Sequence, residues 1–144
     1  MAHSSNSPCP HCGEYKNRTV VIDALIIRDN SVLLIKRGVE PFKNYWALPG
    51  GHVEFDEEVQ EAVTREVNEE TQLMTKSIKL FDIYSKPERD PKQKISLVYI
   101  VEAIGEAVAA DDAKACNWYK LDKLPEKMAF DHKKIVANYI QNCL

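Results

Sequence analysis

The chain has 144 residues, a formal net charge of −3 at pH 7 and 44% hydrophobic residues, which suits one domain with a buried core. Its Lys and Arg residues are scattered among Asp and Glu, which argues against a surface for nucleic acids or for anionic membranes. No apolar run approaches the roughly 20 residues of a membrane span, the polar start lacks a signal-peptide core, and the four cysteines are too few for a disulfide scaffold, so we expect a cytoplasmic protein with reduced cysteines.

Residues 1–17 predict an N-terminal extension that precedes the folded domain of residues 18–144. The extension contains CPHCG, in which Cys9 and Cys12 form a C-x-x-C knuckle. Such a knuckle is half of a zinc ribbon, and the other half should be another closely spaced pair, which the sequence lacks. His3, His11 or a second chain could complete a zinc site, but a loose tail without structural zinc is the interpretation we favour.

The domain begins with two β-branched, apolar runs. TVVIDALII and VLLIKR are separated by the polar RDNS and predict a β-hairpin. GVEPFKNYWALPGG then predicts a loop that leads into a short strand.

After a helical stretch, SIKLFDIY and ISLVYIVEAIG predict two strands joined by the polar loop SKPERDPKQK. A shorter strand follows near residues 117–121, and a C-terminal helix follows behind Asp131 as N-cap. The order of strands, helix, strands and helix predicts an α+β fold or a layered α/β/α sandwich.

Residues 50–73, GGHVEFDEEVQEAVTREVNEETQL, contain the helical stretch between the two groups of strands. We expect Asp56 to be its N-cap. Glu57 and Glu58 would then lie in the first turn, where the helix dipole favours anions, and they need no functional explanation.

Three other carboxylates of this helix lie on its apolar side. At about 100° per residue, Glu66 and Glu70 share an arc with the buried-type residues, and Glu69 lies at its rim. Buried carboxylates are costly without a cation, and Arg65 alone cannot neutralise three of them. Mg²⁺ or Mn²⁺ prefers oxygen ligands, so the pattern predicts a divalent-cation site. The alternative is a solvated acidic face with a different helical phase.

The preceding LPGG places two glycines where a backbone carbonyl or amide can approach a ligand. From here the sequence resembles the Nudix box, G-x5-E-x7-R-E-U-x-E-E-x-G-U, in which U is a bulky apolar residue. Eight positions agree: Gly51, Glu57, Arg65, Glu66, Val67, Glu69, Glu70 and Leu73. Gln72 replaces the usual glycine, at which the helix closes in a left-handed conformation that costs glutamine about 1 kcal/mol.

The resemblance covers most of residues 18–142 and implies a mixed sheet between helices. It also implies hydrolysis of a nucleoside diphosphate linked to another moiety. The implied cation ligands are Glu66, Glu69 and Glu70, with a backbone carbonyl of Gly50 or Gly51. Glu69 is either a ligand or the general base, and Arg65 and Glu57 would pair to hold the helix against the preceding loop.

Many Nudix enzymes take a further glutamate from a late loop. In chains with a phrase similar to DDAKACNW, that glutamate follows the lysine, where this chain has Ala115. The base must then be Glu69, Asp111, Asp112 or another residue. The two aspartates could equally be solvated loop residues.

The substrate prediction rests on residues outside the box. NYWALPGGHVE and YSKPERDPK resemble ADP-ribose pyrophosphatases, in which a proline stands about fifteen residues beyond the box glycine, as Pro87 does here. Arg89 could pair with a phosphate or a terminal ribose, and Phe42, Tyr45 or Phe130 could stack on adenine. Core or loop packing is the alternative for each aromatic ring. Three positions depart from the phrase of those enzymes: Lys86, Lys92 and Gln93.

The sequence therefore predicts a Mg²⁺-dependent or Mn²⁺-dependent hydrolase that splits ADP-ribose, or a close relative, into AMP and ribose 5-phosphate. Another nucleotide sugar, a dinucleotide or a nucleoside triphosphate is the alternative substrate. A catalytically silent nucleotide-binding Nudix module is the alternative class. The resemblance further implies a small-molecule partner and a homodimer, as is common among related enzymes.

Overall fold

A computed structural model describes residues 7–144 of the chain. The elements in chain order are β1 (Val20–Arg28), β2 (Ser31–Arg37), β3 (Trp46–Ala47), β4 (Gly50–His52), α1 (Val59–Thr71), β5 (Met74–Tyr84), a 3₁₀ turn (Pro87–Arg89), β6 (Ile95–Ile104), β7 (Ala113–Lys120) and α2 (His132–Cys143). None of the helices within these residues is long and apolar enough to cross a membrane.

The strands form one mixed sheet. Its main order is β3-β2-β1-β6-β5, with β4 also paired to β1 and β7 to β2. β1 and β2 form the predicted antiparallel hairpin, whose turn residues Asp29 and Asn30 both have positive φ, as a tight hairpin turn requires. β1 and β6 run parallel, and every other pairing is antiparallel. β1 therefore lies inside the sheet, and two of its residues on one face, Val21 and Asp23, line the site.

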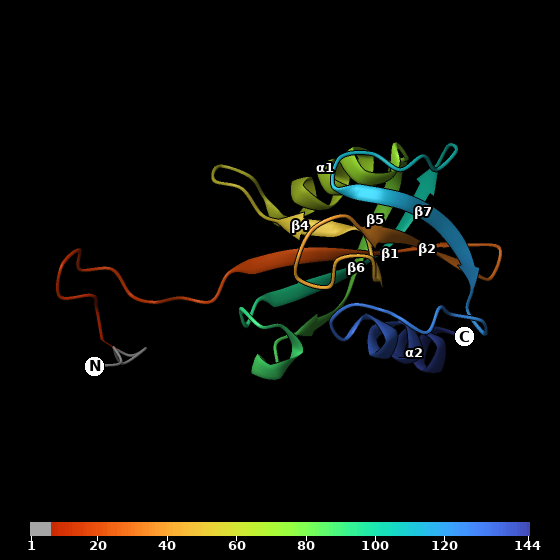
Figure 1. Ribbon diagram of the computed structural model, residues 1–144. Coiled ribbons are helices and arrows are strands. Elements are labelled where there is room, and N and C mark those ends of the chain that lie inside the picture. The colour runs from red at the N-terminus through yellow and green to blue at the C-terminus, as the bar shows by residue number, and fades with distance from the viewer. Residues whose placement is uncertain (1–6) are drawn as a thin grey trace.

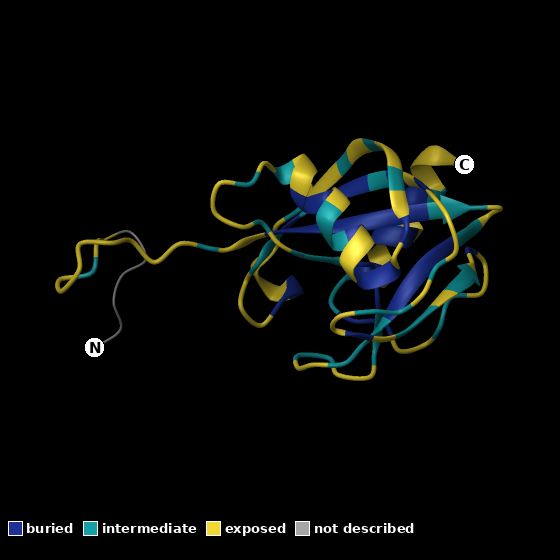
Figure 2. Cartoon of the chain, turned by 90° about the horizontal axis from the view of Figure 1, so that it is seen from above, coloured by how far each residue is buried: buried dark blue, intermediate teal, exposed yellow. Residues whose placement is uncertain are grey.

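The two helices cover opposite faces of this sheet (Figure 1). On one face Ile22 and Ile26 of β1 pack against Val63 and Val67 of α1. On the other face Leu25 packs against the residues of α2, such as Ile135. This alternation follows from the period of two in a strand, and Figure 2 shows strands that are largely buried together with exposed helix surfaces. The predicted α/β/α layering is confirmed.

Several predicted boundaries differ from the structure. α1 begins at Val59 rather than after Asp56, because Glu58 is the N-cap and forms a capping box with Glu61. Asp56 instead lies in the preceding turn with φ 63°. The last predicted strand begins earlier and is longer, as β7 pairs along the whole of β2. At the end of α1, Gln72 has φ 61°, the left-handed conformation predicted there.

Candidate active site

The short strand β4 brings the backbone close to both β1 and α1. A Cβ atom on Gly50 would overlap the carbonyl oxygen of Ile22, and one on Gly51 would overlap the carboxylate of Glu66. At Gly50 the obstacle is backbone, so only glycine permits this approach, whereas at Gly51 the obstacle is the end of a side chain. The N–H of Gly50 donates a hydrogen bond to Oε1 of Glu70 over 2.8 Å, which ties the strand to the helix.

The three helix glutamates differ in burial. Glu70 is 6% exposed, the side chain of Glu66 is 13% exposed, and that of Glu69 is 41% exposed. The predicted placement of Glu66 and Glu70 on the inner side of α1 is therefore what the structure shows, and Glu69 lies at the rim. α1 presents the three carboxylates as a gradient from the protein interior to solvent.

Burial raises the pKa of Glu70 to about 8 and the pKa of Glu66 to about 7. The charges of Glu66 and Asp23 raise the pKa of Glu70 further, and the hydrogen bond from Gly50 opposes them. For Glu66 the opposing group is Arg65. The protein's own groups thus leave these two carboxylates incompletely compensated, which is the electrostatic environment of a cation site.

Arg65 holds the acidic end of the site together. Its Nε and Nη2 donate to the two carboxylate oxygens of Glu57 over 2.7 and 3.0 Å, and Nη2 also donates to the carbonyl of His52 over 2.8 Å. Its Nη1 donates to Glu66 over 2.8 Å and to Glu69 over 3.1 Å. This bidentate pair connects α1 to the loop that follows β4, and it lowers the pKa of Glu57.

The donor set fits a hard divalent cation. Carboxylate oxygens, with a strand of glycines beside them, are ligands for Mg²⁺ or Mn²⁺ rather than for zinc. Within residues 7–144 no three His, Cys, Asp or Glu side chains converge closely enough to form a closed metal cage. Mg²⁺ sites usually have only one or two carboxylates and fill the other positions with water and substrate phosphate, so an open arrangement suits such a site.

The late loop brings two aspartates to the same place. Asp112 lines the pocket together with Glu70, and the carbonyl of Asp112 accepts a hydrogen bond from Gly38 over 3.0 Å. The charge of Asp112 raises the pKa of Glu70, and that of Asp111 raises the pKa of Glu66. The two aspartates therefore lie close enough to act electrostatically on the helix glutamates.

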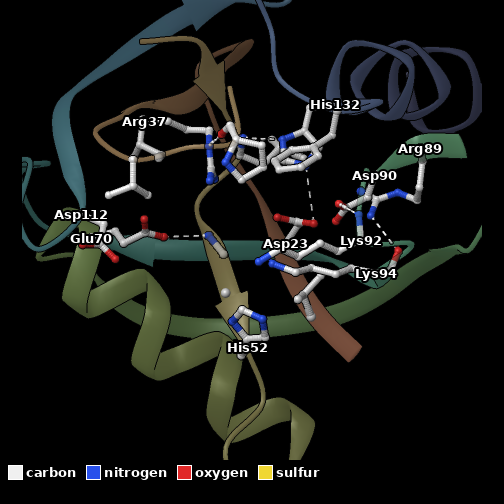
Figure 3. Close-up of a pocket in the computed structure, with 18 of the residues that line it drawn as sticks. Asp23, Arg37, His52, Glu70, Arg89, Asp90, Lys92, Lys94, Asp112 and His132 are labelled. Carbon is white, nitrogen blue, oxygen red and sulfur yellow. Dashed lines mark hydrogen bonds and ion pairs between the residues drawn. The ribbon is translucent and has the colours of Figure 1, made fainter. Parts of the chain in front are cut away.

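A pocket of about 310 Å³ lies beside Glu70 (Figure 3). Four Arg or Lys side chains line it: Arg37, Arg89, Lys92 and Lys94. Arg89 pairs with Asp131, and we call the other three the basic wall. Figure 3 shows Glu70 and Asp112 at one end of the pocket, with Lys92 and Lys94 entering from the other. None of the ion pairs within 4.0 Å among residues 7–144 uses the basic wall. Burial lowers the pKa of Lys94, and the charges of Lys92 and Arg37 lower it further.

A polar group lies under the pocket where the sequence predicted only core. Asp23, 7% exposed, accepts a hydrogen bond from the hydroxyl of Ser96 over 2.5 Å. His132 lies 3.6 Å from Asp23 through Nε2, and its Nδ1 accepts a hydrogen bond from the N–H of Leu48 over 3.0 Å. Since Nδ1 accepts, the neutral ring carries its proton on Nε2, facing Asp23. His132 thus links the start of α2 to the turn that precedes Gly50.

The predicted stacking residues pack against each other. Phe42 lies 4.9 Å from Phe130 and 5.5 Å from Tyr45 between ring centroids, in edge-on geometry. The three rings surround a small buried cluster that includes Ile35. This is the packing alternative rather than a preformed stacking platform, although Phe130 also lines the pocket.

Arg89 also has a partner within the protein. We predicted a phosphate or ribose for its guanidinium, but it pairs instead with both oxygens of Asp131, over 2.9 and 3.0 Å, and with the carbonyl of Lys94. Its side chain is 3% exposed. Because Asp131 uses its carboxylate for this pair, it occupies the N-cap position of α2 without a side-chain capping bond. Pro87 begins the 3₁₀ turn that carries Arg89.

The remaining predicted residues lie elsewhere. Cys9 and Cys12 lie on the N-terminal extension and do not line the pocket. His3 lies outside the described residues. The sequence reasoning missed the pocket role of Lys94, Asp23 and His132, although a single aspartate within the apolar run VVIDALII was a usable signal.

The chain is similar to several known proteins. A family model described as NUDIX domain matches residues 17–139. An ADP-ribose pyrophosphatase of Methanocaldococcus jannaschii is 49% identical over 129 residues, which cover 88% of this chain and 76% of the relative.

Two solved structures are also similar to this chain. A bifunctional NMN adenylyltransferase/ADP ribose pyrophosphatase of Francisella tularensis, complexed with AMP and a Mn ion, is 30% identical with a TM-score of 0.76. The match covers 90% of this chain but 43% of that one. A NUDIX hydrolase of Nitrosomonas europaea has a TM-score of 0.80 at 23% identity, covering 94% of this chain and 78% of that chain, and so shares the fold.

Proposed function

Because the chain belongs to the Nudix family of hydrolases, we propose that it hydrolyses the diphosphate of ADP-ribose, or of a close relative, to AMP and ribose 5-phosphate. The proposed substrate rests on the 49% identity to an ADP-ribose pyrophosphatase over most of both chains. The similar ADP ribose pyrophosphatase of Francisella tularensis, complexed with AMP and a Mn ion, supports the same class of substrate.

The acidic end of the pocket would hold Mg²⁺ or Mn²⁺. Glu66 and Glu70 would bind it, with Glu69 and a carbonyl of Gly50 or Gly51 as further ligands. When bound, a divalent cation neutralises phosphate oxygens and lowers the pKa of a water molecule. The N–H of Gly50 keeps the carboxylate of Glu70 in one orientation, and Arg65 does the same for Glu66 and Glu69.

The basic wall would bind the diphosphate, with Lys92 and Lys94 at the end of the pocket opposite Glu70. Arg37 is already oriented by its hydrogen bond to the carbonyl of Pro41 and by the ring of Phe130, which lies 5.1 Å from the guanidinium. Lys92 and Lys94 have no carboxylate partner within 4.0 Å in the described chain, so their ammonium groups can turn to phosphate oxygens. Together they would stabilise the charge of the departing phosphate.

The attacking water must give its proton to an acceptor. Ala115 stands where many Nudix enzymes have a late glutamate, so another residue must take this role. We assign this role to Asp112. It lines the pocket beside Glu70, whereas the carboxylate of Glu69 accepts a hydrogen bond from Arg65. Asp112 would accept the proton, and no side chain would form a covalent bond to phosphorus.

A substrate panel tests this proposal. Purified protein with Mg²⁺ is offered ADP-ribose, other nucleotide sugars, dinucleotides and nucleoside triphosphates, and the products are separated by chromatography. We expect AMP to be released fastest from ADP-ribose. A faster rate on another compound would replace the substrate and keep the cation site. Binding of ADP-ribose without turnover of any compound would support the silent module instead.

A further inference from the structure

The N-terminal extension carries a second cluster of chemically reactive groups, far from the pocket. It runs away from the sheet before β1 begins, as Figures 1 and 2 both show. Arg18 anchors its base by donating hydrogen bonds to the carbonyls of Gln93 and Ser85, each over 2.7 Å. Beyond that anchor, residues 10–17 are exposed. The tip of this arm is the segment CPHCG.

This segment forms a tight, hydrogen-bonded turn. The N–H of Gly13 donates to the carbonyl of Cys9 over 2.8 Å, and the N–H of Cys9 donates to the carbonyl of Glu14 over 2.6 Å. Gly13 has φ +77°, which glycine adopts without strain.

The turn directs a backbone N–H group at the sulfur atom of Cys9. The N–H of His11 donates to Sγ of Cys9 over 3.4 Å. Both cysteines are free thiols. The turn therefore holds both cysteines at the exposed end of the arm and directs a backbone N–H at the sulfur of Cys9, and thiolate sulfur is a ligand that zinc prefers.

Two sulfur atoms are half of a structural zinc site, which takes four ligands in a tetrahedron. Within residues 7–144 no third His, Cys, Asp or Glu joins the pair into a cluster that could hold a metal ion. The arm holds the turn away from the domain, so a second protein copy can reach it without meeting the sheet or helices.

We propose that Cys9 and Cys12 supply two of the four ligands of a Zn²⁺ site, and that Cys9 and Cys12 of a second copy of this chain supply the other two. The same turn on both copies then closes a two-fold symmetric site with four thiolates. Binding releases the thiol protons, so zinc affinity rises with pH. This inference does not rest on the proposed hydrolase activity, because the arm and the pocket share no residues.

Zinc content and molecular mass of the full chain test the proposal together. Reduced protein is incubated with Zn²⁺, freed of excess metal, and analysed by metal analysis and by light scattering. Since each copy gives two of four ligands, we expect about 0.5 zinc ions per chain. We also expect twice the mass of one chain, and a chelator should release the zinc.

Single substitutions identify the ligands. Cys9→Ser and Cys12→Ser should each reduce the retained zinc at least tenfold, whereas Cys143→Ser, at an exposed cysteine in α2, should retain it. Thermal unfolding of each variant shows that the domain is intact. One zinc ion per monomeric chain, no retained zinc in the wild type, or unchanged zinc in Cys9→Ser would each overturn the shared site.

Discussion

The backbone N–H of Gly50 donates a hydrogen bond over 2.8 Å to Oε1 of Glu70, the most buried of the three helix glutamates. This bond joins the glycine strand to the acidic helix at the point where both meet the pocket. It orients a carboxylate whose burial raises its pKa to about 8. The geometry of the site therefore depends on a strand position that only glycine can occupy.

Alanine substitutions in β4 should separate stability from activity. In Gly50→Ala the new Cβ would overlap the backbone carbonyl of Ile22, which cannot move without breaking the pairing with β1, so we expect a loss of about 1–3 kcal/mol in unfolding free energy. In Gly51→Ala the Cβ meets the carboxylate of Glu66, a movable side-chain end. The unfolding free energy measured with denaturant should then fall less than in Gly50→Ala, while the turnover rate falls. Equal destabilisation by both variants would contradict this distinction.

Metal-free protein should lose stability as pH rises. Glu70 and Glu66 have folded pKa values of about 8 and 7 against an ordinary value of 4.5, so the folded state holds protons that the unfolded state has released. Their contribution to the unfolding free energy is fully present below about pH 4.5 and is lost as pH rises through their folded-state pKa values. We expect the Tm decrease between pH 5 and 8 to be smaller in Glu70→Gln, with Glu106→Gln as the exposed control.

Added Mg²⁺ should reverse that trend, because a cation binds the ionised carboxylates. The rise in Tm on adding Mg²⁺ should be larger at pH 8 than at pH 5.5. A pH-independent rise, or one retained in full by Glu70→Gln, would argue against these carboxylates as ligands.

Asp112→Asn should lower kcat by roughly 10²–10⁴-fold with little change in KM, since it removes the assigned proton acceptor but keeps the size of the side chain. Steady-state kinetics measure both constants. Asp111→Asn is the matched control in the same loop and should retain most activity. If Glu69→Gln instead shows the larger loss in kcat, the acceptor is Glu69.

Lys94→Gln should raise KM by roughly ten- to a hundredfold, as expected for the loss of a charged hydrogen bond to phosphate. Its ammonium group lies in the pocket without a carboxylate partner within 4.0 Å in the described chain. Lys133→Gln, on the exposed side of α2, is the control. A normal KM in Lys94→Gln would remove the basic wall from the phosphate site.

The acidic half of the site could be read from the sequence because it is local. Helical period alone places Glu66 and Glu70 on one face, and the two glycines precede them at a fixed spacing. The start of the helix was misplaced because Asp56 has a cap-type side chain, whereas the actual cap depends on the reciprocal bonds between Glu58 and Glu61.

The basic half could not be predicted, because it depends on contacts between distant segments. Lys92 and Lys94 reach the pocket from the loop before β6, which Arg18 holds beside the start of β1 through hydrogen bonds to Ser85 and Gln93. The pairing of Arg89 with Asp131 spans 42 positions in the chain, and no local pattern indicates it. The same holds for the contact between Phe42 and Phe130, whose rings pack together although they lie far apart in the sequence.

The most direct test of the central claim is the release of AMP from ADP-ribose by the wild type and by Glu70→Gln, each with and without Mg²⁺. The amide can still accept the hydrogen bond from Gly50, so the variant should fold while losing the ligand charge. We predict Mg²⁺-dependent release by the wild type and a loss of roughly 10²-fold or more in kcat in the variant. Equal rates for the two proteins, or release by the wild type that does not require a divalent cation, would contradict the account.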